Sequence, residues 1–246
     1  RTDAQRDALQ AALDRLAPGA FRVALGLKHA APMIETAVDQ LAAEGVRRIV
    51  GLVLAPHFSS YSIGQYLGRT TAAAEPHGIE VRGINSWAIL REFVQFTATD
   101  LAARLTAMPA GTRTLFTAHS LPQRIIDGGD PYPDELAATA RAVAGAAGLT
   151  TEQWSIGWQS AGRTPEPWIG PDVLACIDQA ADEGLPGVVV SAVGFVADHL
   201  EVLYDLDIEA SRHAIGRGIA FDRTACVNDD AGVMAALARL VVDTAS

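Results

Sequence analysis

The segment VGFVADHLEVLYDLDIEA carries a row of acidic residues spaced four apart, Glu201, Asp205 and Glu209. On an α-helix each carboxylate would lie about 40° round from the one before, and the row would climb roughly 12 Å. Like charges at this spacing repel by roughly 0.2–0.5 kcal/mol per pair, whereas hard divalent cations prefer such oxygen ligands. The row is therefore either part of a metal site or a solvated acidic face, which is the usual role of a charge row.

His119 is a second candidate because it directly follows the apolar run RTLFTA, at the expected end of a strand. A histidine there can accept a proton near neutral pH or bind a metal through a neutral ring nitrogen, or its ring can simply cap the strand. The neighbouring Ser120 is a poor hydrolase nucleophile, since the chain has no GxSxG motif. The chain also lacks GxGxxG after a strand, GxxxxGK[ST], HExxH and CxxC, which excludes the usual dinucleotide, P-loop and zinc sites.

Two aromatic residues lie in segments that also follow apolar runs. Trp168 stands in the loop GWQSAGRTPEPWIGPD, whose prolines and glycines pre-shape the backbone. Its ring could form a flat wall for a planar ligand, although a lid over the core is the more common role of such a tryptophan. Tyr66 ends the segment APHFSSYSIGQY, whose hydroxyl groups could bind an anion at a helix N-terminus or merely cap that helix.

The elements that must position these side chains alternate between short apolar runs and amphipathic stretches. Runs with apolar residues on both faces are typical of parallel strands buried between helices. Alternation of strands and helices predicts an α/β protein with right-handed crossovers, in which ligands bind beyond the carboxyl ends of the strands. The expected strands are residues 21–28, 48–55, 79–84, 113–118, 154–159, 187–193 and 219–224, and the clearest helices are residues 32–44, 135–146 and 171–183.

A polar break over residues 85–91 is the candidate crossing between two lobes. We expect the first lobe to comprise residues 1–86, with a C-terminal helix in residues 228–246 packing back on it. The second lobe, residues 87–227, would then carry His119 and the acidic row.

Composition narrows the class of protein. A chain of 246 residues that is 49% hydrophobic and 20% charged can bury a sizeable core, which excludes disorder. Its formal charge of −10 argues against a general nucleic-acid binder. Cys176 and Cys226 are too few for a disulfide scaffold or a four-thiolate iron–sulfur cluster, and no apolar run approaches the ~18 residues of a membrane span. We therefore expect a cytoplasmic monomer without a transmembrane segment.

The motifs taken together resemble the ferrochelatase family. The resemblance extends in order over most of residues 21–210, and its wording is closest to the Gram-positive type, whose members insert ferrous iron into coproporphyrin III rather than protoporphyrin IX. The matching stretches are LGLKHAAPMIETAV, LVLAPHFSSYSIGQY, TAHSLPQRI, GDPYPDEL, GWQSAGRTPEPWIGPDV and VGFVADHLEVLYDLDIEA.

This resemblance implies two Rossmann-like lobes with parallel sheets, a porphyrin held in the cleft between them, and Fe²⁺ as a substrate. It implies that His119 and Glu201 face each other across the porphyrin centre as the metal and proton-transfer pair. Asp205 and Glu209 would continue outward as a path for iron or protons, and so as further metal ligands. Tyr66 and Trp168 would line the porphyrin pocket.

The sequence departs from the family pattern in two ways. The opening strand, with its LLVNFGGP-like text, and the arginine-bearing segment after it are missing, so we expect an N-terminally incomplete first lobe. Some relatives carry a [2Fe–2S] cluster on four cysteines, and the two cysteines here cannot reproduce that set.

Two other functions remain open from the sequence. A two-lobed protein could bind haem or a metal without catalysis, because fold does not imply function. A related chelatase could insert cobalt or nickel, because the affinity order of divalent metals does not by itself select iron. Metal-dependent turnover with a free porphyrin would separate these possibilities.

Overall fold

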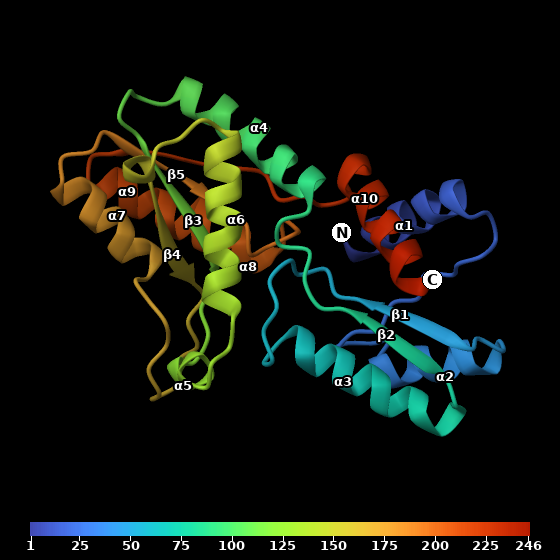
Figure 1. Cartoon of the computed structure of the whole chain (residues 1–246). Helices are drawn as coiled ribbons and strands as arrows, with labels where there is room; N and C mark the ends of the chain where they lie inside the picture. The colour runs from blue at the N-terminus through green and yellow to red at the C-terminus, as the bar shows by residue number, and fades with distance from the viewer. The chain divides into compact units, whose positions relative to one another are not determined.

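The computed structural model describes residues 1–246, which divide into two compact units (Figure 1). Unit 1 comprises residues 1–87 and 228–246, and unit 2 comprises residues 88–227. Every strand pairing in both units is parallel, which confirms the α/β class with parallel sheets. None of the helices combines the length and apolar character that a membrane crossing requires.

Unit 1 is built on a two-stranded sheet in which β1 (Arg48–Leu52) pairs with β2 (Glu80–Ile84). Its apolar helix faces pack on this sheet and on one another, as the periodicity of residues 32–44 predicts. The helices are α1 (Thr2–Leu16), α2 (Ile34–Ala43), α3 (Ile63–Ala74), the 3₁₀ turn η1 (Glu75–His77) and α10 (Ala231–Ala245).

The strand predicted over residues 21–28 is wrong. Its only ladder contact is an isolated bridge between Leu27 and Met33. The side chain of Gln10 takes the place of a neighbouring strand at the start of the segment, since its Oε1 accepts from the N–H of Val23 (2.7 Å) and its Nε2 donates to the carbonyl of Phe21 (3.0 Å). Residues 21–28 do form an apolar segment, but a strand also needs a neighbour with which to form its hydrogen bonds.

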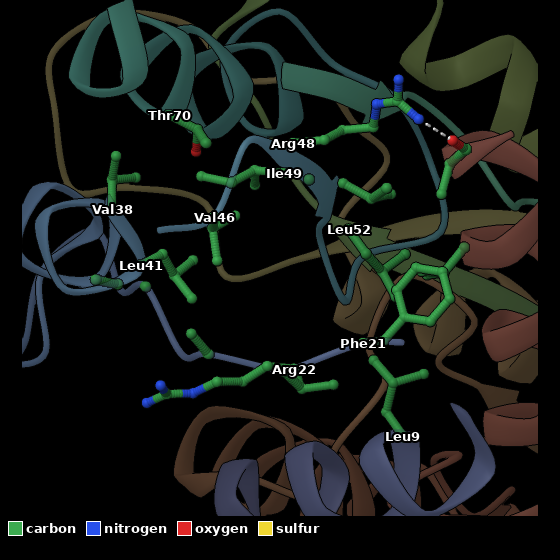
Figure 2. A pocket seen from close by; sticks show the side chains of 18 of the residues that line it. Leu9, Phe21, Arg22, Val38, Leu41, Val46, Arg48, Ile49, Leu52 and Thr70 are labelled. Carbon is green, nitrogen blue, oxygen red and sulfur yellow. Dashed lines mark hydrogen bonds between the residues drawn. The ribbon is translucent and has the colours of Figure 1, made fainter. Parts of the chain in front are cut away.

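A cavity of about 450 Å³ lies beside this segment, inside unit 1 (Figure 2). Consecutive residues of both the 21–24 segment and β1 line it, although alternate side chains of extended backbone point to opposite faces. The cavity therefore lies against the edges of both segments rather than against one face of either. Side chains of α1, α10, α2 and α3 also line it. Figure 2 shows Leu41 and Val46 on one side of the open centre and Phe21 and Leu52 on the other.

Unit 2 contains a four-stranded sheet in the order β4-β3-β5-β6. Because all of its strands are parallel, their carboxyl ends lie at one edge, where β3 delivers His119 and β4 delivers Gln159. The strands are β3 (Arg113–His119), β4 (Trp154–Gln159), β5 (Gly187–Ser191) and β6 (Ala220–Arg223). The helices are α4 (Arg91–Ala107), α5 (Gln123–Asp127), α6 (Tyr132–Ala146), η2 (Thr151–Gln153), α7 (Val173–Asp182), α8 (Leu200–Val202), the π-helix η3 (Leu203–Ala210) and α9 (Ser211–Gly216).

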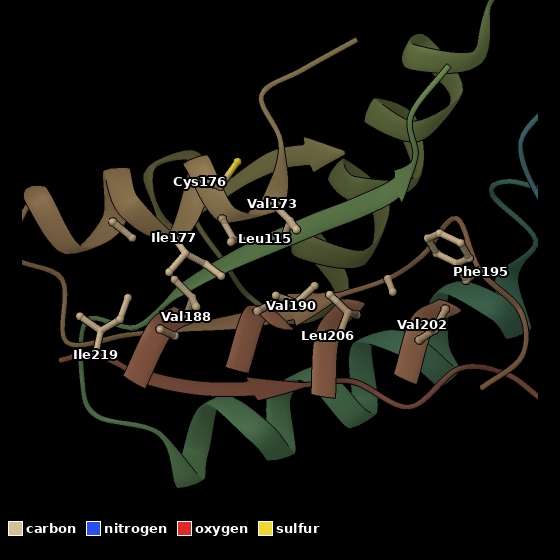
Figure 3. Close-up of a cluster of buried hydrophobic side chains, with 14 of the residues drawn as sticks. Leu115, Val173, Cys176, Ile177, Val188, Val190, Phe195, Val202, Leu206 and Ile219 are labelled. Atoms are coloured by element: carbon tan, nitrogen blue, oxygen red, sulfur yellow. The ribbon is translucent and has the colours of Figure 1, made fainter. Parts of the chain in front are cut away.

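The core of unit 2 fixes the segment that carries the acidic row. Val188 and Val190 of β5 and Ile177 of α7 form a buried cluster with Val202 and Leu206 (Figure 3). The continuous apolar run of β5, all five of whose residues are buried, provides the surface on which α8 and η3 pack. Burial of each such side chain contributes about 1.5–3 kcal/mol.

This segment is not the regular α-helix that the four-residue spacing was assumed to form. Over η3 the backbone adopts a π-helix, with i→i+5 hydrogen bonds and a wider turn. The inward face of the segment from α8 to α9 is a row of fully buried residues, each four residues from the next: Val202, Leu206, Ala210 and Ala214. In an α-helix that spacing would drift by about 40° per step. The wider turn corrects the drift and keeps a four-residue row on one face.

Gly194, in the loop after β5, permits a close approach between two backbone segments. A Cβ atom at this position would lie 2.6 Å from the Cα of Ala118, the residue before His119. We expect Gly194→Ala to lower the free energy of unfolding by about 1–3 kcal/mol, because backbone must move to relieve the overlap. Gly145→Ala in α6 is the matched control, since a Cβ there meets nothing within 4 Å.

Urea denaturation of both variants checks this prediction. The control should be neutral or more stable than the parent by up to about 1 kcal/mol, because alanine favours the helix. Equal stability of the two variants would contradict the close approach.

Candidate functional site

His119 and Glu201 meet at the carboxyl edge of the unit 2 sheet. The Nε2 atom of His119, the last residue of β3, lies 3.3 Å from Oε1 of Glu201 in α8. The two side chains are 38% and 44% exposed, so the pair is sheltered but accessible. Eighty-one residues of chain separate the pair, and the parallel order of β3 and β5 brings them together.

The hydrogen bonds of His119 determine where its protons lie. Its Nδ1 is 2.6 Å from the backbone carbonyl of Ser120, and because a carbonyl can only accept, Nδ1 carries a hydrogen. The contact between Nε2 and Glu201 then needs one further proton, carried either by the ring or by the carboxyl group. The pair is thus an imidazolium facing a carboxylate, or the neutral forms of both, and it can store or release one proton.

Electrostatics favour the charged form of this pair. Burial lowers the pKa of His119, but the hydrogen bonds to Glu201 and to the carbonyl of Ser120, with the charges of Glu201 and Asp205, outweigh it and raise that pKa above its ordinary value. The hydrogen bond from His119 lowers the pKa of Glu201, burial opposes this, and the Ser160 hydroxyl contributes to the lowering. At neutral pH the carboxyl group is therefore ionised.

Asp205 is held beside the pair by Ser160, which follows β4. The Ser160 hydroxyl donates to Oδ2 of Asp205 over 2.5 Å. Ser160 adopts a positive φ of 57°, an uncommon conformation for a residue with a side chain. Such strain is found where the surrounding structure overdetermines a functional position. The hydroxyl therefore donates to Asp205, and it also helps to lower the pKa of Glu201.

Aromatic rings border His119. The ring of Phe195 has its centre 6.3 Å from that of His119, and the ring of Trp168 lies 6.5 Å away. Thr164 fixes the indole of Trp168 by accepting from its Nε1 at 2.8 Å. Gly162 allows this packing, because a Cβ there would lie 2.3 Å from the indole. The His119 edge thus combines a proton-carrying pair with apolar ring faces.

Glu209 and Tyr66 complete the set of predicted site residues. Glu209 is exposed on η3, one step further along the acidic row. Tyr66 belongs to unit 1, on α3, where its ring packs against a small core that includes Ile34 and Val38. Its assignment to a porphyrin pocket stays a prediction.

The donor set beside His119 is small. No group of three or more His, Cys, Asp or Glu side chains in the chain is arranged to hold a metal ion. An open hollow along α8 is lined by His199, Leu200, Glu201, Tyr204 and Asp205. The site therefore offers a histidine and a carboxylate to a passing cation rather than a closed cage, and the metal roles of Asp205 and Glu209 stay predictions.

Sequence reasoning missed two residues of the site. Ser160 stands within the loop that contains Trp168, but a lone serine among prolines and glycines gave no sign of its contact with Asp205. Phe195 follows Gly194 in an apolar run, where a core role is the ordinary interpretation. The only available signal was position, since both residues follow predicted strands at the edge where His119 lies.

Glu201→Gln is expected to lower the pKa of His119. The amide keeps the shape of the side chain but removes the charge that raises this pKa, and burial then dominates. The ring would lose its proton at a lower pH than in the parent, as a ¹H–¹⁵N NMR titration of the imidazole would report. Glu209→Gln is the control and should leave the titration of His119 where it is. An unchanged titration in both variants would show that the pair is not coupled.

A family model described as Ferrochelatase matches residues 1–245. The ferrochelatase of Herpetosiphon aurantiacus is 42% identical over 235 residues, which cover 93% of this chain and 76% of that protein. Coproporphyrin III ferrochelatases of Geobacillus kaustophilus and Geobacillus thermodenitrificans are each 43% identical, over 90% and 98% of this chain and 72% and 78% of their own lengths.

Solved structures agree at the level of the fold. SirB from Bacillus subtilis with Fe³⁺ superposes with a TM-score of 0.67 at 13% identity, over all of this chain and 91% of SirB. CbiX superposes with a TM-score of 0.61 at 20% identity, over all of this chain and 93% of CbiX. These similarities support the two-lobed chelatase fold, and the family match with the 42–43% identities shows that the chain belongs to the ferrochelatase family.

Proposed function

We propose that this protein inserts ferrous iron into a porphyrin in haem biosynthesis, with coproporphyrin III as the porphyrin. The observation that carries the proposal is the His119–Glu201 pair, whose facing atoms are 3.3 Å apart. The wording of the motifs and the names of the relatives from Geobacillus support the choice of coproporphyrin III.

Insertion of iron poses two problems that such a pair can address. The hydrated ion must exchange water for other ligands, and two pyrrole N–H protons must leave the ring. Imidazole and carboxylate both suit Fe²⁺ without the strong retention that thiolates give to softer ions. A site with few donors releases the ion readily, which suits a substrate that has to be passed on.

Proton transfer begins from the charged form of the pair. His119 must first pass its Nε2 proton to Glu201, which releases it to solvent, after which Nε2 can accept a pyrrole proton. The hydrogen bond from Nδ1 to the Ser120 carbonyl keeps the ring oriented during this exchange. Glu201 would receive iron or take the second proton. A raised pKa makes the neutral His119 ring a stronger proton acceptor.

We propose that the acidic row carries protons away from the pair or brings iron to it. Asp205 is four residues from Glu201 and accepts from the Ser160 hydroxyl, and the exposed Glu209 continues the row. We assign these residues to transport rather than to chemistry at the ring. Trp168 would provide an apolar face for the flat macrocycle beside His119, and we keep Tyr66 as a proposed porphyrin-binding residue.

Cysteine chemistry has no part in this proposal. Burial raises the pKa of Cys176 to about 11 and that of Cys226 to about 12, so both thiols stay protonated. Metal-binding cysteines act as thiolates. We therefore propose iron as a substrate only, with no iron–sulfur cluster.

His119→Ala and Glu201→Gln should each lower kcat for iron insertion by about 10²-fold or more, since each removes one half of the proton-carrying pair. The measurement is the absorbance change as free coproporphyrin III becomes the metalloporphyrin. His213→Ala is a matched control, because His213 also pairs with a carboxylate, Asp178, but lies on α9 away from the pair.

Three outcomes would contradict the proposal. Near-normal turnover of the His119 variant would remove its role in the chemistry. Stoichiometric haem binding by a parent protein that shows no turnover would indicate a binding protein. Turnover with cobalt or nickel but not with iron would indicate a different chelatase.

Changing Asp205 to Asn and Glu209 to Gln together should alter the dependence of the rate on iron concentration or on pH, with a smaller loss of kcat than Glu201→Gln. The double variant should melt at the same temperature as the parent or slightly higher, because it relieves repulsion of roughly 0.2–0.5 kcal/mol per pair. Steady-state kinetics beside a thermal melt test this. Unchanged kinetics with unchanged or raised stability would leave a solvated acidic face as the role of the row.

A further inference from the structure

Two further carboxylates bind a single arginine, Arg223 of β6. They belong to residues 198–209, which are here called the Glu201 segment. The guanidinium group of Arg223, the last residue of β6, donates from Nη1 to Oδ1 of Asp198 over 2.8 Å. It also donates from Nε to Oδ1 of Asp207 over 2.5 Å and from Nη2 to Oδ2 of Asp207 over 3.0 Å. Asp198 lies three residues before Glu201, and Asp207 lies six residues after it, so the arginine joins the two sides of the Glu201 segment.

The Arg223–Asp198 contact is sheltered, unlike most surface ion pairs, whereas the Asp207 side chain is 42% exposed. The side chains of Arg223 and Asp198 are only 14% and 15% exposed. The planar guanidinium fork engages both oxygens of Asp207, which adds directional specificity to the attraction of the charges. Arg223 is itself fixed to the sheet, because β6 pairs with β5 and Arg223 stands opposite Val190.

The Glu201 segment has few other anchors. Leu200 and Tyr204 are 82% and 54% exposed, so the outer side of the segment packs on little. The inward row that includes Val202 and Leu206 fixes its depth on the sheet, but apolar contacts are non-directional and constrain sliding and rotation weakly. The Ser160–Asp205 hydrogen bond is one directional restraint, and the two carboxylates bound by Arg223 add restraints on either side of Glu201.

We propose that Arg223 is a positioning residue for metal insertion: by binding Asp198 and Asp207 it holds α8 and η3 in the register that places Glu201 against His119. The expected effect on iron insertion rests on the proposed function, whereas the positioning of Glu201 rests on the ion pairs alone. Arg223 touches neither member of the pair and acts through the backbone between its two partners.

Positioning and simple electrostatics make opposite predictions for His119. If Arg223 acted only as a nearby cation, its removal would leave more negative charge around His119, and the ring would hold its proton to a higher pH. If Arg223 positions Glu201, its removal lets the carboxylate move away, and burial then lowers the pKa of His119. The direction of the change therefore separates the two explanations.

The test compares Arg223→Gln with Arg104→Gln in the metal-free protein by NMR titration of the His119 ring. Arg104 is a matched control because it also joins two carboxylates, Asp100 and Asp222, and also contacts β6. We expect the His119 ring to lose its proton at a lower pH in the Arg223 variant and at the parent's pH in the control.

Iron insertion into coproporphyrin III supplies the second measurement. We expect kcat of the Arg223→Gln variant to fall about 10- to 100-fold, the usual effect of losing a group that orients a ligand, with a smaller change in KM for the porphyrin. Arg223→Lys should recover part of the loss, since an ammonium group can bind one carboxylate but cannot bridge both with a planar fork.

The result that overturns the proposal is a folded Arg223→Gln variant whose His119 titration is unchanged or moves to higher pH, or whose kinetics match the Arg104 control. If Arg223→Gln does not fold, Asp207→Asn keeps the Asp198 contact and should give the same changes in smaller measure. An inactive parent protein would contradict the proposed function, whereas the titration would still decide whether Arg223 positions Glu201.

Discussion

The site depends on the burial of one face of the segment from α8 to α9 against the unit 2 sheet. Each residue of the acidic row directly precedes a buried residue of the inward row, as Glu201 precedes Val202 and Asp205 precedes Leu206. Burial of the apolar residues contributes a free energy of about 25 cal/mol per Å² of buried surface. Because each carboxylate precedes a buried residue, this burial also holds the carboxylates at the edge of the core. The π-helical turn keeps each row on one face of the segment, where both rows would drift together round the axis of a regular helix.

This arrangement concentrates negative charge where one histidine ends a strand. Between residues 198 and 209 the chain has five carboxylates and no lysine or arginine. The structure balances part of this charge with the half-buried Arg223, while Glu201 pairs with the imidazole of His119 and Asp205 with the hydroxyl of Ser160. A pair that holds one movable proton beside uncompensated carboxylates is suited to receive a cation and to give up protons in exchange.

Architecture and activity rest on different evidence in this protein. SirB and CbiX share the fold at 13% and 20% identity, which is too distant to assign a reaction. Relatives at 42–43% identity and the family match assign the chain to the ferrochelatases. Within that family, the local geometry of His119, Glu201 and Ser160 indicates which atoms can hold and pass on protons.

The sequence by itself determined the α/β class, most of the strands and the candidates His119 and Glu201, because hydrophobic periodicity and strand-end positions are local properties of the chain. It did not determine that residues 21–28 fail to form a strand, because pairing depends on a neighbour. It also did not reveal the π-helix, the positive φ of Ser160 or the partners of Arg223. Those features arise where distant segments meet: β6 supplies the cation, β4 the hydroxyl and β5 the packing surface. Only the tertiary structure could decide them, since close packing and directional hydrogen bonds act between atoms that are far apart in the chain.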